Sequence, residues 1–267
     1  MAIGYHVMLR LKDDRVIAPS AAARRLFARV MWRMTRGFWT LAFAAADTHA
    51  HLEVARCGRR DAGELARRIE LSLGRVLELP VGFEPARIKE IRDQGHLGGV
   101  FRYTLRQDRH HGVDVDPMRD ATNLPDLLGL RIGGEHTVAA VRELLPRVQR
   151  EELMSFYEPL GAPGEIVLAD LADAAAASVA RDLRDPRAAR ARVAAVHAVD
   201  ASTQELALAL GLDARSVRRL RQRRPDNSHV VAIQRQLLLR ARLRGRRQKI
   251  HTGSGSLAAV PIGVLMT

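Results

Sequence analysis

The apolar residues in about the first 115 positions switch repeatedly between two periodicities. A repeat of two is typical of a strand with one buried face, and a repeat of 3.6 is typical of an amphipathic helix. Residues 3–11 alternate with period two, whereas residues 21–36 place their apolar side chains on one helical stripe. Ser20 precedes that stripe and is a good N-cap. The chain is therefore predicted to begin with a strand and then a helix.

Two more strands and a second helix are predicted next. Residues 38–45 and 49–57 have the composition of strands and are separated by a short turn-prone segment. Asp61 is expected to cap a helix over residues 62–79, which is closed by proline and glycine. Residues 85–92 then alternate again and predict a fourth strand.

The last element of this region is a helix expected over residues 95–108. The resulting order is β-α-β-β-α-β with a final helix, which is the split βαβ (ferredoxin-like) pattern of an antiparallel sheet with helices on one face. We therefore expect an α+β fold for this part of the chain. Residues 112–135 are rich in Gly, Pro, Asp and Asn and are expected to form an irregular wrap.

The second half of the chain reads as helical from residue 135 onward. We expect a first domain over residues 1–135, a helical DNA-binding region over 136–250 and a flexible tail over 251–267.

A helix-turn-helix is predicted over residues 203–221 within the helical region. The first helix breaks at Gly211, which is free to take the positive φ of a tight turn, and the second begins after Asp213. The polar side chains expected to face outward from the second helix, toward DNA, are Arg215, Ser216, Arg218 and Arg219. An ordinary α-hairpin is the alternative interpretation of this pattern.

The charge of the chain favours a polyanion as partner. The formal net charge is +13, and most of the positive charge comes from arginine. Phosphates neutralised by Arg or Lys release condensed counterions, which favours nucleic-acid binding. A basic protein from an Arg-rich, Ala-rich proteome is the alternative.

The cysteine content and the hydropathy exclude several classes. Cys57 is the only cysteine, which excludes an internal disulfide and a cysteine-based zinc site. No apolar stretch reaches the roughly 20 residues needed to cross a bilayer. The N-terminus lacks the pattern of an export signal. We therefore expect a cytoplasmic protein with no membrane partner.

Two pairs of polar residues could form a site. His49 and His51 are two positions apart on a predicted strand, so both imidazoles leave the same face of the sheet. Tyr103 and Gln107 are four positions apart on a predicted helix and so share one helical face. If that helix packs on the histidine face, Gln107 completes a mixed nitrogen and oxygen site that suits Mg²⁺ or Mn²⁺. The alternative for the histidines is one in the core and one exposed.

Other polar residues have structural interpretations that compete with a functional one. His6, on the first strand, is expected to be a hydrogen-bonded core histidine. Glu53 shares the face of His51 but is expected to be a surface carboxylate on an edge strand. His110 and His111 are expected either to contact phosphate or to lie at an exposed loop end.

Three segments resemble the single-tyrosine HUH transposases, especially the REP-associated tyrosine transposases. They are YHVMLR at residues 5–10, DTHAHL at 47–52 and RYTLRQ at 102–107, and the resemblance covers about residues 1–135. It departs from the family where Asp47 and Thr48 replace the usual Pro-Asn pair.

The resemblance implies a nuclease domain over residues 1–135 and a role for each site residue. His49, His51 and Gln107 would bind the metal, and Tyr103 would attack a DNA phosphodiester to leave a 5′-phosphotyrosine and a free 3′-hydroxyl. The implied partner is single-stranded or hairpin DNA, bound by a monomer or a homodimer.

Two other functions remain possible from the sequence. The first is a non-catalytic, domesticated DNA-binding regulator of the same fold. The second is a hydrolase of a small phosphoester built on the two histidines, although such sites generally need further acidic or histidine ligands.

Overall fold

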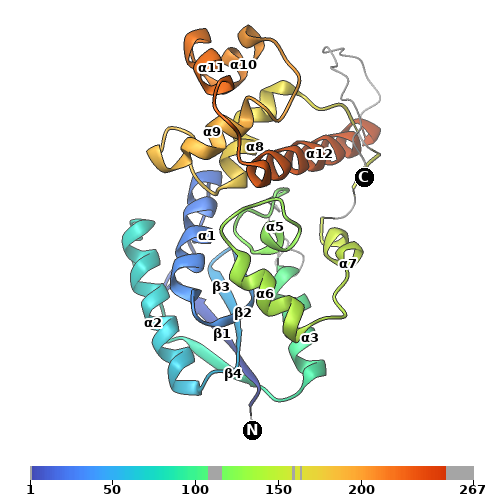
Figure 1. Cartoon of the computed structure of the whole chain (residues 1–267). Helices are drawn as coiled ribbons and strands as arrows, with labels where there is room; N and C mark the ends of the chain where they lie inside the picture. Colours follow the sequence, from blue (N-terminus) through green and yellow to red (C-terminus); the bar gives the residue numbers. More distant parts are fainter. Residues whose placement is uncertain (1, 108–115, 158–159, 163, 251–267) are drawn as a thin grey trace. The chain divides into compact units, whose positions relative to one another are not determined.

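The structure is a computed structural model that describes residues 2–107, 116–157, 160–162 and 164–250, the last five of these by backbone alone. The chain divides into two compact units (Figure 1). The first runs to Leu128 and includes Gly133–Phe156, and the second takes Gly129–Ile132 and the chain from Tyr157 onward.

The first unit is built around a four-stranded antiparallel sheet in the order β2-β3-β1-β4. The strands are β1 (Gly4–Arg10), β2 (Trp39–Ala46), β3 (His49–Ala55) and β4 (Arg87–Ile91). Together with the helices between them, they confirm the predicted α+β fold and its split βαβ order.

The register of the strands divides the sheet into an apolar face and a polar face. Val7 on β1 lies opposite Leu52 on β3 and Ile88 on β4. One residue earlier, His6 lies opposite Lys89 on β4. Because successive side chains of a strand point to opposite faces, the histidines share one face and the aliphatic residues share the other.

Two helices cover the apolar face: α1 (Ala21–Thr35) and α2 (Arg59–Val76). The Phe27 ring of α1 makes an edge contact with the Phe43 ring of β2, at 6.1 Å between centroids. A Cβ added at Gly63 of α2 would lie 3.6 Å from the Ile88 side chain, which places α2 on the same face.

The helix start predicted at Asp61 is wrong, because α2 begins at Arg59. Asp61 stands at the third position of the helix, and its carboxylate accepts a hydrogen bond of 2.9 Å from the Gly58 backbone N–H. A carboxylate is a good hydrogen-bond acceptor for the unpaired N–H groups of a helix's first turn. Asp61 therefore does cap α2, but from the third position of the helix rather than from the residue before it.

Helix α3 (Gln94–Leu105) packs on β2 and β3. It ends three residues before the predicted end at residue 108. The Arg106 N–H is shared between the carbonyls of Arg102 and Tyr103, and Arg106 itself leaves helical geometry at φ −106 and ψ 10. This tightened last turn ends the helix.

The predicted irregular wrap covers the open edge of β2. The Asn123 side chain accepts from the Phe43 N–H at 3.0 Å and donates to the Leu41 carbonyl at 2.9 Å. The Ala45 N–H donates to the Ala121 carbonyl at 3.0 Å. An edge strand exposes unpaired backbone groups, and here they are satisfied by a loop rather than by another strand.

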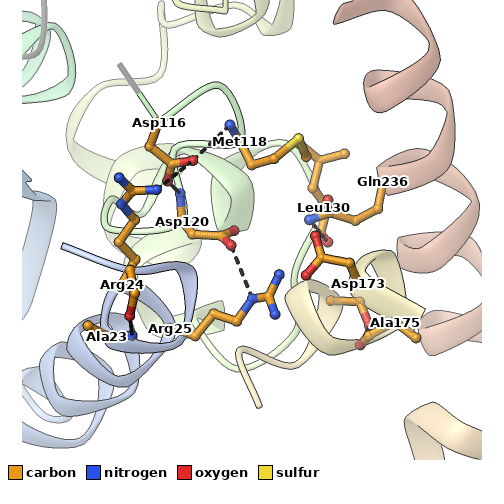
Figure 2. Close-up of polar contacts among 12 residues, drawn as sticks. Ala23, Arg24, Arg25, Asp116, Met118, Asp120, Leu130, Asp173, Ala175 and Gln236 are labelled. Atoms are coloured by element: carbon orange, nitrogen blue, oxygen red, sulfur yellow. Dashed lines mark hydrogen bonds and ion pairs between the residues drawn. The ribbon is translucent and has the colours of Figure 1, made fainter. Parts of the chain in front are cut away.

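Ion pairs fasten the same wrap to α1 (Figure 2). Arg24 lies 3.5 Å from the Asp116 carboxylate, and Arg25 lies 3.1 Å from that of Asp120. Asp116 also accepts from the backbone N–H groups of Met118 and Asp120, at 3.1 and 2.6 Å. The wrap is thus held from both the strand side and the helix side.

Helix α5 (Leu124–Leu127) lies within the wrap, and α6 (Glu135–Leu144) and α7 (Arg150–Ser155) follow it. Helix α6 packs against β2 and belongs to the first unit, as does α7. The compact unit around the sheet therefore extends past residue 135, where the sequence placed the end of the first domain.

The second unit is helical. Its elements are the short 3₁₀ turns η1 (Leu168–Asp170) and η2 (Pro186–Ala188) and the helices α8 (Leu171–Ser178), α9 (Ala189–Ala195), α10 (Thr203–Leu210), α11 (Ala214–Arg221) and α12 (Asn227–Ile250). Leu206 of α10, Val217 of α11 and Ile233 of α12 meet in one buried cluster. The Gln236 side chain of α12 donates to the Leu130 carbonyl at 3.0 Å (Figure 2).

The predicted helix-turn-helix segment contains two helices, α10 and α11, joined by a short turn. Gly211 ends α10 in the left-handed conformation, at φ 62 and ψ 38. Ser202 and Glu205 form a reciprocal cap at the start of α10, and Asp213 caps α11 through the Ser216 N–H at 2.7 Å. The Gly211 N–H and the Asp213 cap therefore fix the two ends of the turn, and the Ser202–Glu205 cap fixes the start of α10.

Within the described residues, no helix has the length and apolar character needed to cross a membrane. The predicted flexible tail at 251–267 lies outside the described residues.

Replacing Asn123 by Ala tests the covered edge of β2. The substitution leaves the buried Phe43 N–H and Leu41 carbonyl without partners, so we expect the free energy of unfolding to fall by about 2–4 kcal/mol. Urea denaturation measures this free energy. The control is Gln149→Ala, which removes an exposed carboxamide and should change the free energy of unfolding by less than about 0.5 kcal/mol. Equal effects of the two substitutions would show that the Asn123 bonds do not hold this edge.

Candidate active site

The two histidines of β3 lie side by side on the polar face of the sheet. Their ring centroids are 6.3 Å apart with an interplanar angle of 28°. The His49 Nδ1 atom is 2.8 Å from the Thr48 hydroxyl, and the His51 Nδ1 atom is 3.0 Å from His6 Nε2. Metal-binding histidines usually have one ring nitrogen held in this way, which leaves Nε2 as the atom suited to a metal.

His6 belongs to this group rather than to the apolar core. Its ring stacks on His51 at 5.2 Å between centroids. Burial, together with smaller contributions from charge repulsion by Lys89 and His96, lowers the pKa of His6 to about 4. A neutral His6 can accept a hydrogen bond from His51 Nδ1–H, which sets the tautomer of His51. The strand register places His6 on this face, because Met8, two residues later on β1, lies opposite His51.

Tyr103 of α3 stands over these rings. Its ring meets those of His51 and His6 edge-on, at 5.8 and 5.9 Å between centroids. The chain has three tyrosines, all within the described residues; Tyr103 is 41% exposed, whereas Tyr5 and Tyr157 are 7% and 3% exposed. Tyr103 is thus the tyrosine that a macromolecular substrate can reach.

Neighbouring contacts hold the end of α3 that carries this tyrosine. Arg102 forms an ion pair of 2.5 Å with Glu152 of α7. Arg119 of the wrap is buried and donates from Nη1 to the Leu105 carbonyl at 2.8 Å. A cation at the C-terminal carbonyls of a helix is favourable, because it complements the helix dipole. The position of Arg119 could not be foreseen, because nothing in the sequence links the wrap to α3.

Gln107 does not share a helix with Tyr103 as predicted. It lies two residues past the end of α3 and is fully buried. The four-residue spacing therefore no longer places the two side chains on one helical face, and the role of Gln107 as a ligand stays a prediction.

The predicted metal ligands are two imidazoles and a carboxamide. Within the described residues, no group of three or more His, Cys, Asp and Glu side chains has the arrangement of a metal site. The fit of a divalent ion therefore depends on the two strand histidines, whose Nδ1 atoms are held by Thr48 and His6. Imidazole nitrogen and carboxamide oxygen are both ordinary ligands of divalent ions.

The prediction for Glu53 is wrong. Its strand, β3, lies inside the sheet, and the Glu53 side chain is completely buried. Neither carboxylate oxygen has a hydrogen-bond partner in the described part of the chain. Burial raises the pKa of Glu53 well above its ordinary value, because a charged carboxylate is costly away from water. His110 and His111 lie outside the described residues.

The predicted DNA-contact residues all lie on α11, but they differ in their surroundings. Arg215, Arg218 and Arg219 are exposed. The Ser216 hydroxyl instead donates to the Asp213 carboxylate at 2.7 Å, and its N–H donates to the same group. Three of the four side chains thus present charge to solvent, whereas Ser216 caps the helix.

Other arginines of the second unit are used within it. Arg221 donates to the Thr203 hydroxyl at 3.1 Å, which ties α11 back to α10. Arg240 of α12 lies 2.7 Å from the Asp173 carboxylate, and Arg244 pairs with Asp170.

Comparison with known proteins found one solved structure with a distant similarity, described as a REP-associated tyrosine transposase bound to a REP hairpin. The match covers 42% of this chain and 70% of that one, at 17% identity and a TM-score of 0.36. No protein-family model matches the sequence, and no curated protein matches it. The resemblance is therefore that of a distant structural relative.

Proposed function

We propose that this protein is a metal-dependent endonuclease and transposase that nicks and rejoins single-stranded hairpin DNA through Tyr103. The observation that supports the proposal most is the position of this exposed phenol, edge-on to His51 and His6 and beside a second strand histidine, His49. A nucleophile and a pair of metal-ligand side chains on one face of a rigid sheet are the parts that such a reaction needs.

Each residue has a part in binding and orientation. His49 and His51 would hold the ion through Nε2, and Gln107 would add a carboxamide oxygen. His6 acts through His51, whose Nδ1 atom lies 3.0 Å from His6 Nε2, and is therefore a positioning residue. When bound, Mg²⁺ or Mn²⁺ polarises the scissile phosphate and offsets the charge that develops on it.

The tyrosine supplies the covalent chemistry. Phenols are weak nucleophiles at neutral pH, so the Tyr103 oxygen must be placed accurately against the phosphate. The Tyr103 oxygen bonds to phosphorus as the bond to the 3′ oxygen breaks; the phenol loses its proton, and the 3′ oxygen gains one. The products are a 5′-phosphotyrosine and a free 3′-hydroxyl. The covalent bond keeps the phosphoester available for rejoining to another 3′ end.

Replacing Tyr103 by Phe should abolish a covalent protein–DNA adduct and leave DNA binding intact. The assay incubates the protein with labelled hairpin DNAs carrying single-stranded extensions and Mn²⁺, and the adduct is resolved on a denaturing gel. The same reaction with a chelator in place of Mn²⁺ should give no adduct.

The matched control is Tyr5 replaced by Phe, which removes a hydroxyl from a buried tyrosine and should leave the adduct in place. A parent protein that binds hairpins tightly without metal but forms no adduct across a broad hairpin pool would be a non-catalytic, DNA-binding regulator.

Helix α11 is the proposed contact with duplex DNA, such as the stem of the hairpin. Arg215, Arg218 and Arg219 are exposed on one short helix that follows a glycine turn. Exposed arginines along the second helix of such a pair are suited to base edges and phosphates in the major groove. Ser216 was predicted to join them, and its contact with DNA would require its hydroxyl to leave Asp213.

Replacing Arg215, Arg218 and Arg219 together by Ala should weaken duplex binding and make it less sensitive to salt. Each lost phosphate contact should reduce the slope of log affinity against log salt by about 0.9. The measurement is fluorescence anisotropy with a labelled duplex over a range of salt concentrations.

The control removes the same charge elsewhere in the second unit, from the exposed Arg184, Arg187 and Arg190. If both triple variants lose the same affinity and the same slope, α11 has no special role and only the net charge matters.

A further inference from the structure

The polar face of the sheet continues from the candidate active site onto β4, where it carries two uncompensated cations. Arg87 lies opposite Met8 of β1, and Lys89 lies opposite His6. Both side chains are exposed. Within the described residues neither has a hydrogen bond or an ion pair, so their charge is directed at solvent. We call Arg87 and Lys89 the β4 cation pair.

The acidic and basic side chains of β4 lie on opposite faces of the sheet. Glu90 lies opposite Tyr5, on the other face of the sheet, and is within 3.9 Å of Arg92. Arg10 shares the face of the β4 cation pair, but it lies 3.8 Å from the carboxylates of both Asp14 and Glu84. On this face of β1 and β4, within the part of the chain that the structure describes, the cations with no carboxylate in ion-pair distance are thus Arg87 and Lys89.

The spacing of the β4 cation pair suits the backbone of a single strand. Residues two apart on a strand are separated by about 7 Å, which is of the order of the distance between successive phosphates in an extended strand. Strand β4, which carries the two cations, is the second strand away from β3, which carries His51, so the two strands are roughly 10 Å apart across the sheet. A strand whose scissile phosphate lies at Tyr103 would reach them within a few nucleotides.

We propose that the single-stranded DNA beside the cut runs from Tyr103 across β1 onto β4, where its phosphates contact Arg87 and Lys89. The position of the scissile phosphate in this inference rests on the proposed function. The binding of single-stranded DNA by the β4 cation pair does not depend on cutting. These contacts go to phosphates and carry no sequence preference, as expected of a path that guides a strand into a site.

The test compares two double variants made in a protein that also carries Tyr103→Phe, without metal, so that binding is measured apart from cutting. The first is Arg87→Ala with Lys89→Ala. The control is Arg67→Ala with Arg68→Ala, which removes the same charge from exposed positions of α2, on the opposite side of the sheet. Fluorescence anisotropy measures the affinity for a hairpin with a single-stranded extension and for the same hairpin without it, over a range of salt concentrations.

The β4 variant should bind the extended hairpin several-fold more weakly, with a salt slope smaller by about 1.4, which corresponds to two phosphate contacts on a single strand. Its affinity for the hairpin without the extension should be unchanged, and the α2 control should bind both DNAs normally. Equal losses for the two DNAs, an equal loss in the α2 control, or no loss at all would overturn the inference.

The result is separable from the nuclease proposal. Loss of extension binding in the β4 variant, with no adduct formed by the parent protein, would support the strand path and reject the nuclease. Adduct formation by the parent, with unchanged extension binding in the β4 variant, would support the nuclease and reject the strand path.

Discussion

The antiparallel register between β1 and β3 is the constraint on which the candidate site depends. Met8 lies opposite His51 and His6 lies opposite Glu53, which puts all the histidines of these two strands on one face. A slip of one residue would turn a strand over and send its histidines into the aliphatic core. The burial of Val7 and Leu52 on the other face opposes such a slip, because the strand that turned over would carry its aliphatic side chain to the polar side.

The remaining elements place the tyrosine against that face. Helices α1 and α2 fill the apolar side, which leaves the polar side for α3. The wrap then contributes at two points, because Asn123 covers the edge of β2 and Arg119 holds the last carbonyl of α3. An irregular segment with little regular structure thus supports both the sheet and the helix that bears Tyr103.

Much of the first unit and the helix pair of the second could be predicted from periodicity and caps, as the Ser20 cap and the Gly211 turn show. The errors arose where long-range contacts decide the outcome. Glu53 was assigned to an exposed edge, because strand order cannot be read from spacing, and β3 proved to be internal. The end of α3 was misplaced because its last turn tightens at Arg106 and is closed by Arg119, 14 residues away.

The central claim is that Tyr103 is the residue that becomes bonded to DNA. Mass spectrometry of the adduct, after digestion of both protein and DNA, tests it directly by locating the nucleotide on one peptide. The account predicts a 5′-phosphonucleotide on Tyr103 and unmodified Tyr5 and Tyr157. A nucleotide on either buried tyrosine, on another side chain, or attached through its 3′ phosphate would contradict it.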